Sequence, residues 1–72
     1  MSDRQMAALR ALGDGGAHSL VEVATRMDTT LPAAQRVLDA LYRRSLVRIT
    51  DTGRWCLSDR GRTKLNGKGM HA

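Results

Sequence analysis

Residues 29–44, TTLPAAQRVLDALYRR, decide the fold of this chain. Thr30 belongs to the residue types that cap helix N-termini, and Pro32 then falls in the first turn, where its missing N–H breaks no hydrogen bond. The proline therefore marks the start of a helix, which we expect over residues 31–44. Steps of about 100° per residue bring five apolar side chains to one face, which predicts that this face is buried. They are Ala34, Val37, Leu38, Leu41 and Tyr42.

The opposite face of this helix is polar or small. It carries Pro32, Arg36, Asp39, Ala40 and Arg43, with Gln35 on its flank. Asp39 and Arg43 stand four residues apart with the acid first, the spacing of a surface ion pair worth about 0.2–0.5 kcal/mol. Arg36 is a second cation within reach of Asp39. Taken alone, this face fits either a solvated surface or one that contacts a partner.

A first helix is predicted earlier in the chain, from Ser2, a suitable N-cap, to about Leu12. Met6 and Leu9 share its apolar stripe with Leu12. The glycine-rich GDGG at residues 13–16 ends it. The two residues that follow, Ala17 and His18, are enough only for a minimal strand.

A second helix is predicted to open at Ser19. Ser19 and Glu22 have the spacing of a capping box, in which each side chain accepts a hydrogen bond from the other residue's backbone N–H. The apolar face of this helix comprises Leu20, Val23, Ala24 and Met27. Residues 28–30 separate it from the helix at 31–44, and a break of three residues suits a helix-turn-helix.

Beyond the long helix, the pattern changes from helical to alternating. Apolar and polar side chains alternate in SLVRIT (45–50), and WCLS (55–58) resumes the alternation after a glycine-containing turn. Two such runs predict a β-hairpin over residues 46–58. Trp55 shares the apolar phase of the second run, and Tyr42 edges the apolar face of the helix. Both are therefore predicted to pack in the core.

The C-terminal end of the chain is predicted to be a short helix and a tail. Ser58 can cap a final helix through Leu65, whereas residues 66–72, NGKGMHA, have no periodicity and are predicted to be disordered. Seventy-two residues allow one small domain, which we place at residues 1–65. Its fold class is α+β, mostly α, with three helices, a two-stranded hairpin and a short last helix.

The positive charge of the chain is distributed unevenly. The net charge is +5; residues 1–35 hold three Arg and four Asp or Glu, whereas residues 36–72 hold nine Lys or Arg and three Asp. Seven of those nine cations are arginine, which matches phosphate oxygens in a bidentate manner. Such a distribution is typical of a surface that meets a polyanion, although a merely solubilising surface shares it.

Few residues support catalysis, a cofactor or a metal site. His18 and His71 are isolated, Cys56 has no cysteine partner, and no cluster of three or four metal ligands is evident. GRTKLNGKG (61–69) does not fit a phosphate-binding loop, since no Ser or Thr follows Lys68. The chain begins with charges where a signal peptide is apolar, and no run reaches the ~20 residues of a membrane span. We expect a cytoplasmic, non-enzymatic protein without cofactor or metal.

Two motifs identify a more specific fold. SLV at 45–47 opens the first predicted strand, and WCLSDRG at 55–61 runs from the second strand into the last helix. With the helix order of residues 19–50, they resemble the winged helix-turn-helix domains of bacterial transcription regulators. That superfamily usually has GLV at the first motif, and an aromatic residue, Leu, Ser or Thr, an acid, a base and Gly at the second. The resemblance covers residues 2–65 and indicates the fold more firmly than the function.

The resemblance implies a mode of DNA binding. The helix at 31–44 would lie in the major groove, and its early outward residues would meet base edges. These residues are Thr30, Pro32, Ala33, Gln35 and Arg36. Arg36 suits guanine and Gln35 suits adenine. The hairpin would act as a wing, and the expected phosphate contacts are Ser19, Arg43, Arg44, Arg48, Thr52 and Arg54.

The sequence leaves two functions open. The first is sequence-specific double-stranded DNA binding by a small transcription regulator that acts as a repressor. The second is a winged-helix module that docks on a polymerase or another protein complex, which Asp39 with Ala33 and Ala40 would suit. The oligomeric state also stays open: a homodimer that reads two half-sites is common among such regulators. The first helix, with Met1 and Met6, and the segment near Leu65 are its expected interface.

Overall fold

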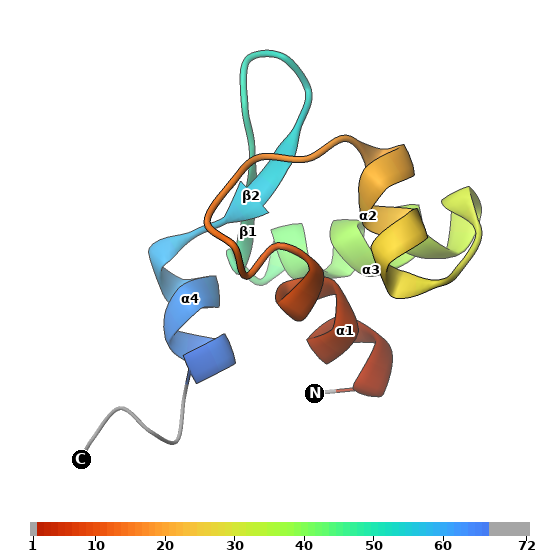
Figure 1. The fold of residues 1–72 in the computed structure, drawn as a ribbon. Coiled ribbons are helices and arrows are strands. Elements are labelled where there is room, and N and C mark those ends of the chain that lie inside the picture. Colours follow the sequence, from red (N-terminus) through yellow and green to blue (C-terminus); the bar gives the residue numbers. More distant parts are fainter. Residues whose placement is uncertain (1, 67–72) are drawn as a thin grey trace.

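Four helices and one two-stranded sheet make up residues 2–66, the part of the chain that this computed structural model describes. In chain order they are α1 (Asp3–Ala11), α2 (Leu20–Met27), α3 (Leu31–Arg43), β1 (Val47–Ile49), β2 (Trp55–Leu57) and α4 (Asp59–Asn66) (Figure 1). This confirms the predicted order and fold class. The predicted first strand is an isolated bridge between His18 and Trp55. The predicted tail lies outside the described residues except for Asn66, the last residue of α4.

A hydroxyl side chain caps the start of each of these four helices. The caps are Ser2, Ser19, Thr30 and Ser58, each accepting from the backbone N–H three residues further on, at 3.2, 3.2, 3.3 and 2.9 Å. A cap of this kind stabilises a helix by about 1 kcal/mol. The local signals therefore set where each helix begins. α3 ends at Arg43 with Arg44 as its C-cap, one residue earlier than predicted.

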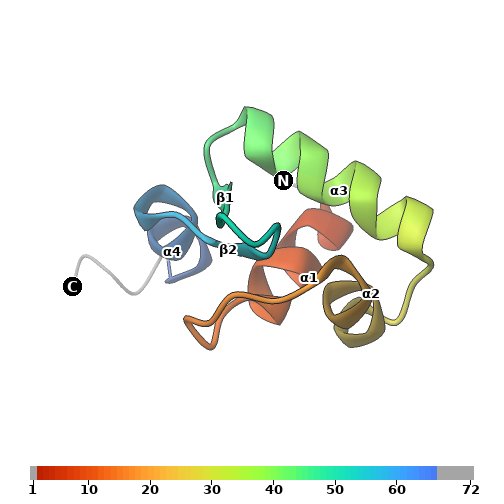
Figure 2. The same ribbon diagram turned by 90° about the horizontal axis from the view of Figure 1, so that it is seen from above.

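The core lies where α1, α2, α3 and the hairpin meet (Figure 2). Its largest fully buried side chains are Leu9, Leu12, Leu38, Leu41, Leu46, Val23 and Val47. On the predicted inner face of α3, the buried residues are Ala34, Val37, Leu38 and Leu41. The prediction that Tyr42 packs in the core was wrong, because its side chain is 54% exposed. Its ring instead packs edge-on against the buried Trp55, with centroids 6.4 Å apart and an interplanar angle of 88°.

The hairpin projects from the helical body, and α4 packs beside its base (Figures 1 and 2). The two strands are antiparallel, with Arg48 opposite Cys56 at the centre. α4 approaches the segment between α3 and β1 so closely that a Cβ atom on Gly61 would overlap the carbonyl oxygen of Leu46. Only glycine fits there, which gives a structural reason for the last residue of the WCLSDRG motif.

Two non-glycine residues have left-handed backbone conformations. Asp28 ends α2 with φ 57°, and Ser45 follows α3 with φ 61°. This conformation costs a residue with a Cβ atom about 1–2 kcal/mol relative to the right-handed one. Ser45 occupies the position where the resembled superfamily has glycine, so the usual glycine of that motif serves this turn.

No helix within residues 2–66 is long and apolar enough to cross a membrane.

Candidate nucleic-acid interface

The N-terminal turns of α3 bring the predicted base-contacting residues together. Thr30 caps the helix, and Pro32 occupies its first turn without interrupting it. Thr30, Pro32 and Arg36 are exposed, whereas Gln35 is half-buried. Ala33 is also half-buried and lines a groove of about 140 Å³ between α1 and the start of α3. α3 lies along one side of the molecule, with α1 and α2 beneath it (Figure 2).

Asp39 has a partner that the sequence did not predict. Gln35 donates a hydrogen bond from Nε2 to Asp39 Oδ1 at 2.8 Å. Within residues 2–66, Asp39 forms no ion pair with Arg36 or Arg43, so the predicted pairing was wrong. Residues three or four apart are neighbours on a helix, so either arginine could have reached Asp39. The result is that the arginines of α3 are not neutralised by their own helix.

The C-terminal end of α3 carries two arginines with different surroundings. Arg43 is exposed, in the last turn of the helix. Arg44 donates from Nη1 to Gln5 Oε1 at 3.3 Å and so reaches back to α1. It also lines a groove of about 270 Å³ with Arg60 and Lys64 of α4. Arg44 therefore stands between α1 and α4, at the far end of α3 from the base-contacting set.

The tip of the wing is ordered by one hydroxyl group. Thr50 Oγ1 accepts from the backbone N–H of Arg54 at 3.1 Å and lies 3.0 Å from Thr52 Oγ1. Gly53 supplies the left-handed residue of the turn, with φ 78°. Thr52 and Arg54 are exposed, as is Arg48 on β1. The hairpin thus presents Arg48 on its first strand, and Thr52 and Arg54 at its turn.

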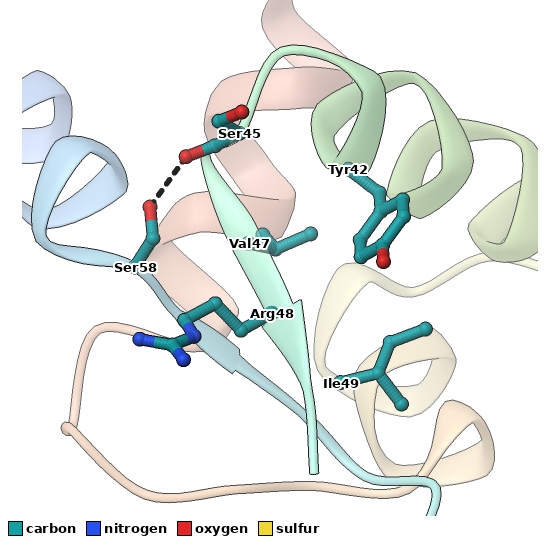
Figure 3. A pocket seen from close by; sticks show the side chains of 6 residues that line it. All are labelled: Tyr42, Ser45, Val47, Arg48, Ile49 and Ser58. Atoms are coloured by element: carbon teal, nitrogen blue, oxygen red, sulfur yellow. Dashed lines mark hydrogen bonds between the residues drawn. The ribbon is translucent and has the colours of Figure 1, made fainter.

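An open groove of about 530 Å³ separates the end of α3 from the wing (Figure 3). Tyr42 and Ile49 lie on one side of β1, and Arg48 points to the other side (Figure 3). Ile49 is 46% exposed, because β1 runs out beyond the core at this point. Ser45 and Ser58 also line the groove, and the hydroxyl of Ser58 donates a hydrogen bond to the carbonyl of Ser45 at 2.6 Å. Tyr42, which lines the same groove, is 54% exposed.

Ser19 is the N-cap of α2. The N-terminal end of α2 lies on the side of the molecule from which the hairpin projects (Figure 1). The hydroxyl oxygen of Ser19 is already an acceptor for the backbone N–H of Glu22, so it can donate its own hydrogen to a further acceptor such as a phosphate oxygen. The helix N-terminus adds a favourable partial positive charge at this point.

A cluster of paired charges joins α2 to the loop that follows α1. We call Asp14, His18, Glu22 and Arg26 the α2 charge cluster. The imidazole of His18 lies 2.9 Å from Asp14 through Nε2 and 3.0 Å from Glu22 through Nδ1. Arg26 joins both carboxylates at 3.1 Å and donates to the carbonyl of Ala11 at 2.8 Å. Every ion pair found within residues 2–66 belongs to this cluster.

The α2 charge cluster corrects two predictions. His18 was predicted to be isolated, but it is buried among charged partners. Glu22 turns to His18 and Arg26, so Ser19 and Glu22 form only the serine half of a capping box. The hydrogen bond to Asp14 raises the pKa of His18, and the same contact holds the pKa of Asp14 well below its usual range. The four residues stand at a repeated spacing of four from 14 to 26 in the sequence, but this spacing alone did not predict their pairing.

Across residues 2–66, no group of three or more His, Cys, Asp or Glu side chains is placed to hold a metal ion. Cys56 is half-buried on β2. His71 and Met1 lie outside the described residues.

Several solved structures share this fold, although no protein-family model and no curated protein matches the chain. A MarR family transcriptional regulator from Silicibacter pomeroyi is 23% identical with a TM-score of 0.85, over 92% of this chain and 49% of that one. BpsR of Bordetella bronchiseptica, whose DNA binding is regulated by 6-hydroxynicotinic acid, is 26% identical with a TM-score of 0.83, over 92% and 50%.

The same architecture occurs in a protein of another kind. The O-methyltransferase NcsB1 from neocarzinostatin biosynthesis is 20% identical with a TM-score of 0.70, over 92% of this chain and 22% of that one. The chain spans about half the length of the regulators it matches. It has the winged-helix fold of the MarR-family regulators, with α2 and α3 as the helix-turn-helix and the hairpin as the wing.

Proposed function

We propose that this chain binds double-stranded DNA sequence-specifically and acts in transcription regulation as a repressor that occupies its site. α3 enters the major groove and the hairpin contacts the flanking backbone. The base-contacting residues are Thr30, Pro32, Ala33, Gln35 and Arg36. The phosphate-contacting residues are Ser19, Arg43, Arg44, Arg48, Thr52 and Arg54.

One observation carries this proposal: the arginines of α3 and the wing have no acidic partner within residues 2–66. Arg36, Arg43, Arg48 and Arg54 are all exposed, and none takes part in an ion pair there. Like charges on one surface repel one another unless an anion neutralises them. The DNA backbone is a regular array of such anions, and its release of counterions supplies much of the affinity of basic proteins.

In vitro selection of bound duplexes across a salt series tests the proposal. We expect one enriched sequence, and its symmetry reports whether two copies bind two half-sites. The four arginines of the phosphate set predict a slope of log K against log salt of about −3.6, at about −0.9 per neutralised phosphate. Arg10→Ala, an exposed arginine of α1, is the matched control and keeps this slope. Retention no better than that of a random duplex refutes sequence-specific binding.

A second function, docking on a protein, is favoured by the groove that Tyr42 and Ile49 line. Two exposed apolar side chains in one groove are a common feature of protein-binding surfaces. Purification from cells with and without nuclease separates the two functions. A stoichiometric protein that survives nuclease and is lost in Tyr42→Ser supports docking, whereas bound nucleic acid supports the first proposal.

A further inference from the structure

Asp39 is an acid on the outer face of the helix that we place in the DNA groove. It is exposed, and its Oδ1 accepts a hydrogen bond from Nε2 of Gln35 at 2.8 Å. No hydrogen bond or ion pair within residues 2–66 uses Oδ2. The structure therefore leaves one oxygen of a fixed carboxylate directed to solvent, beside the exposed Arg36.

The chemistry of a carboxylate restricts what it can read. An ionised carboxylate only accepts hydrogen bonds, so it requires a donor on the base. In the major groove, guanine presents the acceptors N7 and O6, and thymine presents O4; both repel a carboxylate. Adenine offers its N6 amino group but places the acceptor N7 beside it. Cytosine offers its N4 amino group with no adjacent acceptor on the same base.

We propose that Asp39 is a specificity-determining residue, which accepts a hydrogen bond from the N4 amino group of a cytosine, and that Gln35 positions it. This inference rests on the proposed function, because it needs α3 in the major groove. Gln35 fixes the carboxylate before binding, so less side-chain entropy is lost when the base contact forms. Arg36, three residues before Asp39 on the same face, is free to read a guanine.

The same charge that reads cytosine weakens every other complex. A carboxylate on the binding face repels phosphates and the acceptor edges of guanine and thymine. Discrimination between sites therefore increases while the affinity for random DNA falls, the combination that specificity requires. An acid at this position is thus consistent with DNA binding and with a strong preference among sequences.

Base analogues in the selected duplex test the role of the amino group. At the position that Asp39 reads, cytosine is replaced by the 2-pyrimidinone nucleoside, which lacks only the N4 amino group, and Kd is measured by fluorescence anisotropy. We expect the wild-type protein to lose about 5- to 160-fold in affinity, the equivalent of about 1–3 kcal/mol for a base contact. In Asp39→Asn, the loss falls by at least fivefold, and affinity for random DNA rises.

Asp51→Asn is the matched control, since it removes the same charge from the exposed turn of the wing. It is expected to raise affinity for all duplexes alike and to keep the cytosine preference. Gln35→Ala is expected to lower that preference by less than Asp39→Asn, because the carboxylate remains but loses its tether. Thermal unfolding of each variant shows that the helix is intact, so a change in base preference cannot be assigned to lost structure.

The outcomes separate this inference from the proposed function. An enriched site whose cytosine preference is the same in wild type and Asp39→Asn overturns the role of Asp39 and leaves sequence-specific binding standing. Selection of guanine or thymine at every position that depends on Asp39 has the same consequence. No enrichment by the wild-type protein removes both the inference and the function on which it rests.

Discussion

The charges around α2 and the charges along α3 and the wing differ in whether the protein itself neutralises them. In the α2 charge cluster, each of the four side chains has an opposite charge within 3.1 Å. On α3 and the wing, no arginine has a carboxylate partner within residues 2–66. The first set is already satisfied inside the fold, whereas the second set is available to an external anion.

The position of the α2 charge cluster explains what its charges do. The backbone N–H and C=O of His18 pair with those of Trp55 at 2.8 and 2.7 Å. His18 therefore connects the loop between α1 and α2 to strand β2. Arg26 adds a bond to the carbonyl of Ala11 at the end of α1. The paired charges thus connect α1, α2 and the base of the wing. Their work is structural, and we expect their loss to change stability more than DNA affinity.

The most severe way to disturb this arrangement is to move α4. Gly61→Ala places a methyl group against the carbonyl oxygen of Leu46, and backbone cannot yield there as a side chain can. We expect a loss of about 3 kcal/mol in the free energy of unfolding, the upper end of the usual cost of overpacking. Urea unfolding measures it. Thr63→Ala, at an exposed position of α4, is the control and is expected to change stability by less than about 0.5 kcal/mol.

Substitutions of the arginines on α3 and on the wing are expected to affect DNA binding in different ways. Arg36→Ala removes a base contact and relaxes sequence preference by about 5- to 160-fold, the equivalent of about 1–3 kcal/mol. Arg54→Ala removes a phosphate contact, so it weakens binding to all sequences alike and makes the salt slope less steep by about 1. Titrations of specific and random duplexes at several salt concentrations distinguish them. Equal effects of both variants on both duplexes contradict the assignment.

A smaller effect, of opposite sign, is expected at the turn between α3 and the wing. Ser45→Gly relieves a left-handed conformation that costs a Cβ-bearing residue about 1–2 kcal/mol, while glycine adds about 0.4–1 kcal/mol of unfolded-chain entropy. The balance predicts a gain of about 0.5 kcal/mol in stability. Thermal unfolding measures it, and DNA affinity is expected to stay the same. A loss of stability shows that the hydroxyl or Cβ of Ser45 has a role of its own.

The fold could be predicted from the sequence because its signals are local and act over three or four residues. Thr30 and Pro32 mark the start of α3, and the alternation at residues 45–50 marks β1, whatever surrounds them. Periodicity gave the direction in which Tyr42 points but not where the opposing surface ends, so its exposure was missed.

The partners of charged residues needed the three-dimensional structure. Asp39 has Gln35 one turn before it and Arg43 one turn after it, and the sequence does not choose between them. In the α2 charge cluster, Asp14 and His18 lie outside the helices. A spacing of four residues brings side chains together only within a helix, so it did not predict this pair. Their meeting depends on how the loop after α1 folds back against α2.

The pH dependence of stability gives the smallest effect and the most direct contrast between the two sets of charges. The hydrogen bond to Asp14 raises the pKa of His18 above its ordinary value of 6.5, so folding favours the imidazolium. That contribution is fully present below pH 6.5 and is lost as the pH rises through the folded-state pKa. The pKa of Asp14 is lowered, so its contribution is present above about pH 4 and is lost in stronger acid.

We therefore expect the α2 charge cluster to stabilise the fold most between about pH 4 and 6.5. His18→Gln removes the decline above that window, so the difference in unfolding temperature between wild type and variant shrinks from pH 6 to pH 8. The effect is small because Asp14 and Glu22 are 48% and 43% exposed and are screened by solvent. Arginines keep their charge throughout, so the salt slope of DNA binding stays constant over the same range. A difference in unfolding temperature that grows with pH contradicts the charged state assigned to His18.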